Sequence, residues 1–311
     1  MILIGEVHTG LLRNSTALTA GASATLLGFK PGSPAQYGER PVRFARSPEL
    51  LTGVDCALAS IGAVPRGIGT VGSRASVIGG QILLSSSYAT ITPSGASRRL
   101  TWSHYLSRPG VIEVLGRVQA RALCSGFLRA AIPPPTLDLG AVNARIIREV
   151  QTRPGLNRRS AFRAQSTRLR WAAIADSAET GNVVFALRRN GLRTVELHCG
   201  GEEPAELIAL CEDLALHDWL LSTLLKLIDH SMIGAAPRRE AIARLIPAMD
   251  FILHLWMPGV RLGEQAKAFW RALDQQAALS KQWQASVDRV RDQFSMATIT
   301  RLLASHSFDH S

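Results

Sequence analysis

Hydrophobic positions in the first 117 residues fall in short runs separated by glycine, proline and polar turns, which is the pattern of β-strands. Gly79-Gly80 is a two-residue hairpin signal between two of these runs. A segment dominated by Ala and Leu near 17–28 predicts one helix. Strands are predicted over 2–7, 52–59, 73–78 and 81–92.

Residues 119–198 change from helical to strand periodicity. Helices are predicted over 119–131 and 138–151, and the proline run 133–135 forces an extended break between them. Asn190-Gly191 is a strong hairpin signal. Three strands are predicted, over 167–176, 182–189 and 192–198, and their alternating apolar residues indicate an antiparallel β meander.

From residue 202 onward the apolar spacing is helical, and strands and helices are therefore segregated along the chain. This order predicts an α+β fold with a β-rich N-terminal part, a central antiparallel β meander and a C-terminal helical bundle. The predicted domains are a β-rich N-terminal domain (1–131), a helix and Arg-rich connector (132–166), and the meander with the bundle (167–311). The pattern leaves open whether the β regions form one sheet or two. The last helices are predicted over 203–232, 237–256, 262–279 and 281–304.

Composition limits where the protein can reside. An apolar content of 46% with 19% charged residues is typical of a globular chain and not of a disordered one. The most hydrophobic region, 242–260, contains charged residues and prolines, so it cannot span a bilayer. The first ten residues lack the basic region of a signal peptide. We therefore expect a cytoplasmic protein without a membrane partner.

Basic residues are concentrated in the first two thirds of the chain. The net charge of +11 divides into +14 for residues 1–200 and −3 for residues 201–311. Eight arginines within 26 residues are opposed only by Glu149: Arg145, Arg148, Arg153, Arg158, Arg159, Arg163, Arg168 and Arg170. Because guanidinium groups match phosphate geometry, this segment predicts nucleic-acid or polyanion binding. A solvated basic face, or a dock for the acidic C-terminal part, explains it equally well.

Residues 66–74, RGIGTVGSR, have the G-x-G-x-x-G spacing of dinucleotide-binding turns. That chemistry needs a helix opening at the third glycine and an acidic residue about 20 positions later. Here β-branched residues and glycines follow, and no acid occurs between Asp55 and Glu113. We therefore interpret the motif as a turn or bulge in a sheet, flanked by Arg66 and Arg74. No cofactor is predicted.

The adjacent pair His217-Asp218 lies in a strongly apolar helical segment. Such a pair is typical of HD-type metal-dependent phosphohydrolases, which makes these two residues candidates for catalysis and metal binding. Further ligands would have to come from His198, Asp250 or His254. Because no second part of that motif is present, we prefer a hydrogen-bonded pair inside the core, with His254 also a satisfied core histidine.

Five runs resemble an uncharacterised family of actinobacterial, largely streptomycete, proteins of unknown function. The Arg- and Ala-rich composition agrees with a GC-rich actinobacterium. The resemblance spans nearly the whole chain and implies no catalytic residue. It implies a partner instead, because members of the family are encoded beside a ParA/MinD-like ATPase. The runs are 51–56, 67–75, 102–110, 210–221 and 282–289.

Three functions follow from these features. The absence of a complete catalytic motif, the charge asymmetry and the resemblance favour a non-enzymatic accessory or adaptor component of a cytoplasmic multi-protein system, working with a partner ATPase through protein–protein interaction. The first alternative is nucleic-acid or polyanion binding through the basic patch from Arg145 to Arg170. The second is metal-dependent phosphohydrolysis at His217-Asp218.

Overall fold

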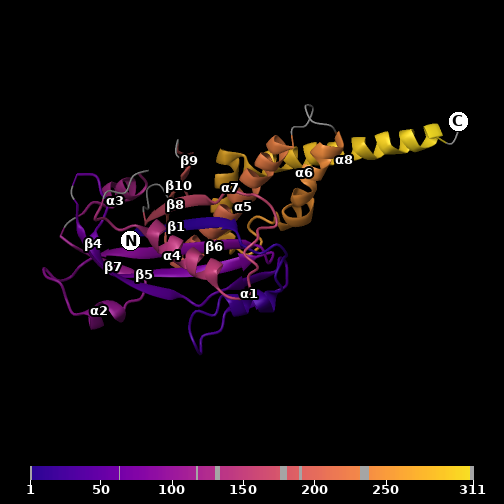
Figure 1. Ribbon diagram of the computed structural model, residues 1–311. Coiled ribbons are helices and arrows are strands. Elements are labelled where there is room, and N and C mark those ends of the chain that lie inside the picture. The colour runs from indigo at the N-terminus through magenta and orange to yellow at the C-terminus, as the bar shows by residue number, and fades with distance from the viewer. Residues whose placement is uncertain are drawn as a thin grey trace. The chain divides into compact units, whose positions relative to one another are not determined.

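The computed structural model describes residues 2–62, 64–116, 118–129, 134–175, 181–188, 191–231 and 238–308, except for the side chains of 238–239 and 300–308. Within these residues the chain has the predicted α+β fold, with a mostly antiparallel sheet and a helical C-terminal region (Figure 1). The described strands all join one ten-stranded sheet, so the two β regions of the sequence are continuous.

The strands are β1 (Ile2–Leu11), β2 (Gln36–Gly38), β3 (Phe44–Arg46), β4 (Leu50–Ala57), β5 (Arg66–Ile78), β6 (Ile82–Pro93), β7 (Val111–Leu115), β8 (Thr167–Ala175), β9 (Val183–Leu187) and β10 (Arg193–Cys199). The helices are α1 (Ala20–Leu26), α2 (Trp102–Leu106), α3 (Ala120–Phe127), α4 (Leu139–Thr152), α5 (Pro204–His230), α6 (Arg238–Phe251), the 3-10 turn η1 (Leu253–Leu255), α7 (Glu264–Ala277) and α8 (Leu279–Phe308). Each predicted segment overlaps one of these elements, although β1, β5 and α8 are longer than predicted. Predicted ends at 130–131, 176, 189, 232 and 237 lie outside the described residues.

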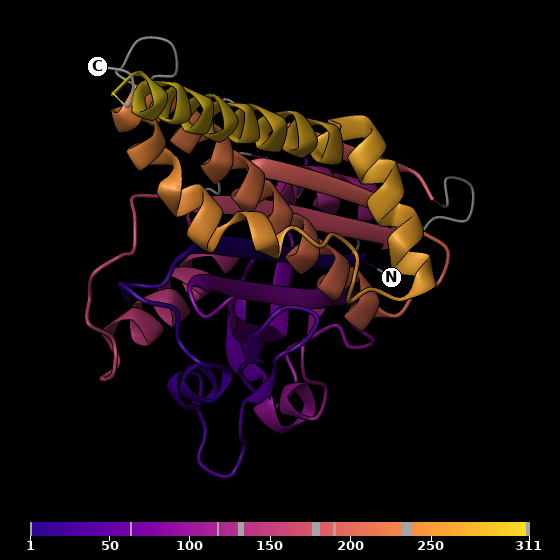
Figure 2. The same ribbon diagram turned by 90° about the vertical axis from the view of Figure 1, so that its right-hand side faces the viewer.

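Strand β1 lies in the interior of the sheet. The order is β2-β3-β5-β7-β6-β1-β8-β10-β9, and β4 also pairs with β5. Figure 2 shows indigo β1 between violet β6 and salmon β8. Strands β9 and β10 pair antiparallel, as their hairpin signal predicts, but β10 lies between β9 and β8 and is parallel to β8. Alternating apolar residues identify a strand but do not say which strand lies beside it. The predicted antiparallel meander therefore did not include the parallel pairing of β10 with β8.

The glycine motif lies inside β5 and does not form a turn. A Cβ at Gly69 would lie 2.0 Å from the Val111 carbonyl oxygen of β7, and one at Gly67 would lie 2.8 Å from the Ile112 side chain. A Cβ at Gly72 would lie 2.7 Å from the Tyr88 ring. The glycines are therefore needed where neighbouring strands and side chains approach closely. The hairpin predicted after the motif is confirmed, but its loop has three residues and not two, because Ile78 pairs with Ile82 across Gly79, Gly80 and Gln81.

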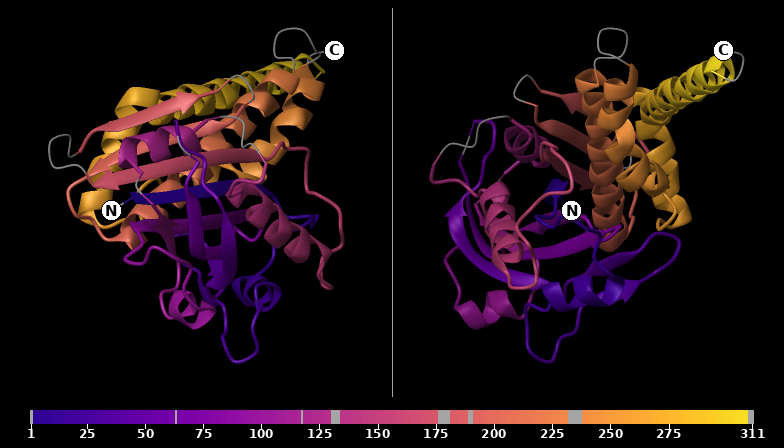
Figure 3. Two further views of the ribbon diagram at one scale, coloured as in Figure 1. Left: turned by 90° about the vertical axis from the view of Figure 1, so that its left-hand side faces the viewer. Right: turned by 45° about the vertical axis from the view of Figure 1, so that its right-hand side comes forward.

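Helix α4 covers one face of the sheet and positions the site described below. Asp138 caps its first turn by accepting a hydrogen bond from the Ala141 amide at 3.1 Å. Its buried residues recur at helical spacing and pack on β1 and β6: Leu139, Gly140, Asn143, Ile146 and Val150. The first part of α5 lies on the opposite face of the sheet (Figure 3). There the Glu212 carboxylate accepts hydrogen bonds from Arg74 of β5.

The chain divides into two compact units. The larger contains Met1–Leu216 and Pro258–Ala277, and the smaller contains His217–Met257 and Ala278–Ser311. The whole sheet belongs to the larger unit. In the smaller unit Trp256 stacks on Trp283 with ring centroids 4.3 Å apart and planes 8° from parallel. Helix α5 begins in the larger unit and ends in the smaller.

Candidate anion-binding site

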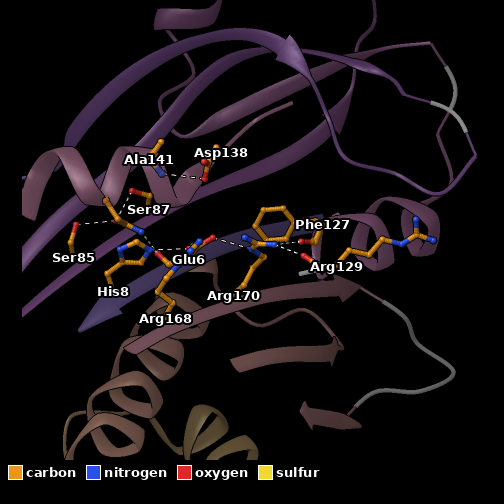
Figure 4. A network of polar contacts seen from close by, with 11 residues as sticks. Glu6, His8, Ser85, Ser87, Phe127, Arg129, Asp138, Ala141, Arg168 and Arg170 are labelled. Atoms are coloured by element: carbon orange, nitrogen blue, oxygen red, sulfur yellow. Dashed lines mark hydrogen bonds and ion pairs between the residues drawn. The ribbon is translucent and has the colours of Figure 1, made fainter. Parts of the chain in front are cut away.

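Two pairs of polar side chains face each other across strands β1 and β8. In the β1–β8 register Glu6 is opposite Arg170 and His8 is opposite Arg168. Because successive side chains of a strand point to opposite faces, all four lie on one face of the sheet. The backbone carbonyl of Glu6 accepts a hydrogen bond at 2.7 Å from Asn143 of α4, so this is the face that α4 covers (Figure 4).

The side chain of Glu6 is completely buried, and His8, Arg168 and Arg170 bind its two carboxylate oxygens. Its Oε1 accepts hydrogen bonds from His8 Nε2 at 2.9 Å and from Arg168 Nη2 at 2.6 Å, and its Oε2 accepts one from Arg170 Nε at 2.9 Å. Burial alone would raise the pKa of Glu6. The His8 hydrogen bond and the positive charges of Arg170, His8 and Arg168 outweigh burial and lower the pKa from 4.5 to about 2.

Asn143 connects this carboxylate to the rest of the sheet. Besides donating to Glu6, it accepts hydrogen bonds at Oδ1 from Ser85 at 2.9 Å and from Ser87 at 2.8 Å, both on β6. Asn143 has no exposed surface. Buried polar groups must be paired, and here the pairing ties α4 to β1 and β6 at a fixed rotation.

Three of the eight clustered arginines are structural. Arg170 is 1% exposed and donates to the carbonyls of Phe127 and Arg129 as well as to Glu6. Arg153 donates to the Leu26 carbonyl at 2.7 Å and lies over the Phe29 ring. Arg168 is half-exposed but is bound to Glu6. These side chains hold the fold together and are not available to an external ligand.

The other five arginines are exposed and make no side-chain hydrogen bond or ion pair with any residue that the structure describes. They lie on the outer side of α4 and on the segment that follows it: Arg145, Arg148, Arg158, Arg159 and Arg163. We call these five residues the basic surface. No described carboxylate of the acidic C-terminal part pairs with them, so the docking interpretation of this segment receives no support.

A recess of about 590 Å³ opens beside the basic surface, at the end of β1. Its polar lining includes His8, Arg13, Arg148, Gln151, Ser160 and Ser166, and its described lining contains no Asp or Glu. Gln151 fixes one wall, because it donates to the Leu11 carbonyl at 2.9 Å and accepts from the Arg13 amide at 2.8 Å.

Asn157 ties the segment after α4 to the residues that follow β1. Its side chain accepts a hydrogen bond from the Ser15 amide at 3.1 Å, and its backbone amide donates to the Asn14 side chain at 3.0 Å. These contacts join the two segments that supply Arg13 and Ser160 to the recess.

The arginines that flank the glycine motif form ion pairs within the larger unit. Arg66 binds both oxygens of Asp55, at 2.7 and 3.0 Å. Arg74 binds both oxygens of Glu212, at 2.7 and 2.8 Å. Both guanidiniums are thus used in ion pairs within the fold.

His217 is a hydrogen-bonded core histidine of the smaller unit. Its Nε2 accepts from the Met257 amide at 3.2 Å, and its ring meets the Trp256 ring edge-on at 5.0 Å. Asp218 is also buried, whereas His254 is exposed, contrary to the expectation of a core histidine. Among the described residues no group of three or more His, Cys, Asp or Glu could hold a metal ion.

Comparison with known proteins gives no match to a family model, a curated protein or a solved structure. Within the described part of the chain, no helix combines the length and apolar character needed to cross a membrane. Function has to be argued from the geometry of the larger unit.

The sequence did not single out Glu6, His8 or Arg13. A signal for the first two was present, because Glu6 and His8 are polar residues two positions apart in an otherwise apolar strand, as Arg168 and Arg170 are in β8. Spacing by two places both members of each pair on one face. Arg13 belongs to the recess only because the chain folds back on residues more than 130 positions away.

Proposed function

We propose that the protein is a cytoplasmic, non-enzymatic accessory component that binds a phosphate-rich polyanion through the basic surface. The observation that carries the proposal is that five exposed arginines occur between residues 145 and 163, and that none of their side chains forms an ion pair with a described residue. Guanidinium groups are weakly hydrated and match phosphate oxygens with two parallel hydrogen bonds. The release of counterions from a polyanion would supply most of the affinity.

Nucleic acid is the polyanion that the basic surface suits, bound through its backbone. Phe162 is the one aromatic residue between Arg145 and Arg170 in the sequence. Without several aromatic rings there is no platform on which successive bases could stack. Binding should therefore be independent of sequence and strongly dependent on salt.

The test is a salt titration of binding to a labelled single-stranded oligonucleotide and to the matching duplex. We expect the triple variant R158A/R159A/R163A to lower the slope of log K against log salt by about 2 for the single strand and by about 3 for the duplex. The matched control R40A/R98A/R289A removes three exposed arginines outside the basic surface and should leave the slope unchanged. Undetectable binding of both probes at low salt would disprove the proposal.

The role as an adaptor for a ParA/MinD-like ATPase stays a prediction that rests on the resemblance in the sequence. Its test is independent of nucleic acid. The tagged protein, isolated from its native host after nuclease treatment, should bring down a P-loop ATPase in stoichiometric amount. Recovery of the protein alone from a lysate in which that ATPase is present would refute the prediction.

A further inference from the structure

We propose that the recess beside α4 is a binding site for a terminal phosphate, that is, a phosphate monoester, with Arg13 and Arg148 as its cationic ligands. The proposal builds on the proposed function, because a nucleic-acid strand with a phosphorylated end is one source of such a group. It adds a recessed site beside the basic surface.

The charge around the recess favours an anion. The inner wall contains His8, which is bound to Glu6, and the single negative charge of Glu6 faces the two positive charges of Arg168 and Arg170. The arginines at the opening, Arg13 and Arg148, add two further positive charges. Because the described lining contains no carboxylate, a dianionic ligand would meet uncompensated positive charge on each side.

The hydrogen-bonding groups of the recess also fit phosphate. The side chains of Arg13 and Arg148 are exposed and make no hydrogen bond or ion pair with a described residue. Hydroxyl groups of Ser160 and Ser166 line the same recess and are exposed as well. Two guanidiniums and two hydroxyls provide enough donors for the three terminal oxygens of a phosphate monoester.

The size of the recess favours the end of a nucleic-acid strand as its ligand over an internal segment of the strand. A volume of about 590 Å³ is that of a pocket for a small ligand. The rest of its lining consists of Thr9, Gly10, Leu11, Leu83, Ile147, Thr152 and two alanines, and it offers no Phe, Tyr or Trp ring to a base. The ligand should therefore be recognised by its phosphate and not by a stacked base, and a dianionic monoester should be preferred to a monoanionic diester.

The test compares a 5′-phosphorylated oligonucleotide with its 5′-hydroxyl form, both binding to the full-length protein at one salt concentration. We expect the phosphorylated form to bind about tenfold more tightly, because the monoester end gains at least one charge-assisted hydrogen bond. The double variant R13A/R148A should abolish this preference. The matched variant R145A/R158A removes two arginines of the basic surface that do not line the recess, so it should weaken both probes equally and keep the preference.

Competition identifies the source of the phosphate. Displacement of the 5′-phosphorylated probe by ribose 5-phosphate, but not by ribose, would show that the monoester alone is the ligand. If the phosphorylated oligonucleotide still binds about tenfold more tightly but ribose 5-phosphate does not displace it, the recess binds the phosphorylated end of a strand. Equal binding of the two oligonucleotides overturns the terminal-phosphate site while leaving the basic surface standing, whereas no binding of either overturns both.

All four arginines used in these variants are exposed and without described partners, so folding should be preserved. Circular dichroism and thermal unfolding verify this before binding is compared. If R13A/R148A and R145A/R158A reduce the preference to the same extent, the recess is not the site and the proposal fails.

Discussion

Glu6 is the residue on which the polar network depends. It is the only described acid bound to Arg170, and it also binds Arg168 and His8. Removing the charge of Glu6 leaves Arg170, which is 1% exposed, with a positive charge that water cannot reach. We expect Glu6→Gln, which keeps the size of the side chain, to lower the free energy of unfolding by about 3–5 kcal/mol in urea denaturation.

The matched control for this substitution is Glu149→Gln. Glu149 also forms an ion pair with an arginine, Arg153, but its side chain is 50% exposed. An exposed pair of this kind contributes about 1 kcal/mol or less. Equal effects of the two substitutions would show that the Glu6 network does not stabilise the fold.

The pKa of Glu6 gives the network a defined dependence on pH. Folding lowers this pKa from 4.5 to about 2, so the ionised carboxylate favours the folded state. The stabilisation is fully present above the pKa of the unfolded chain and disappears as the pH falls through the pKa of the folded protein. We expect the difference in unfolding free energy between wild type and Glu6→Gln to be constant near neutrality and to shrink from about pH 5 to about pH 2. A difference that does not change over this interval would contradict the assignment.

At the scale of elements, β5 shows what its glycines do. Gly69 lies where the backbone of β7 crosses at a distance that admits no Cβ. We expect Gly69→Ala to separate β5 from β7 and to lower the free energy of unfolding by about 2–3 kcal/mol, measured by thermal or urea denaturation. Gly95→Ala is the control, because a Cβ there has nothing within 4 Å, and it should change stability by less than about 0.5 kcal/mol.

The sequence predicted those elements that depend on residues close together in the chain. The hairpin at Gly79-Gly80 and the pairing of β9 with β10 depend on turn residues, and the amphipathic spacing of α4 depends on its own apolar face. The place of β1 between β6 and β8 could not be read, because it depends on residues more than 70 positions away.

The candidate site shows the same division between local and distant information. The sequence indicated the arginine-rich segment but could not separate structural from available side chains. Arg170 differs from Arg163 through its contact with Glu6, 164 residues away. The recess likewise lies between the end of β1 and α4, and no pattern of neighbouring residues predicts that these two elements lie side by side.

For the whole molecule, the two compact units separate stability from the proposed function. All residues of the basic surface and of the recess belong to the larger unit. Trp283 is 5% exposed and stacks on Trp256 in the smaller unit. We expect Trp283→Ala to lower the free energy of unfolding by about 3–5 kcal/mol, in urea denaturation followed by circular dichroism, while leaving oligonucleotide affinity unchanged under conditions where the protein stays folded.

For R158A/R159A/R163A we expect the opposite. This variant should bind oligonucleotides more weakly, while its free energy of unfolding should equal that of the wild type. A loss of binding in folded Trp283→Ala would instead show that the smaller unit takes part in the interaction.

The position of β1 has a consequence for the order of events during synthesis. Strand β1 leaves the ribosome before both of its neighbours, β6 and β8, and the second of these is not complete until residue 175. Until then one edge of an almost entirely buried strand has no partner, and pairing it requires closure of a loop of about 150 residues. The nascent chain therefore exposes an aggregation-prone edge for as long as it takes to translate the residues from β1 to the end of β8. Slow translation through residues 94–166 would prolong this exposure, and a chaperone that occupies the edge would shorten it.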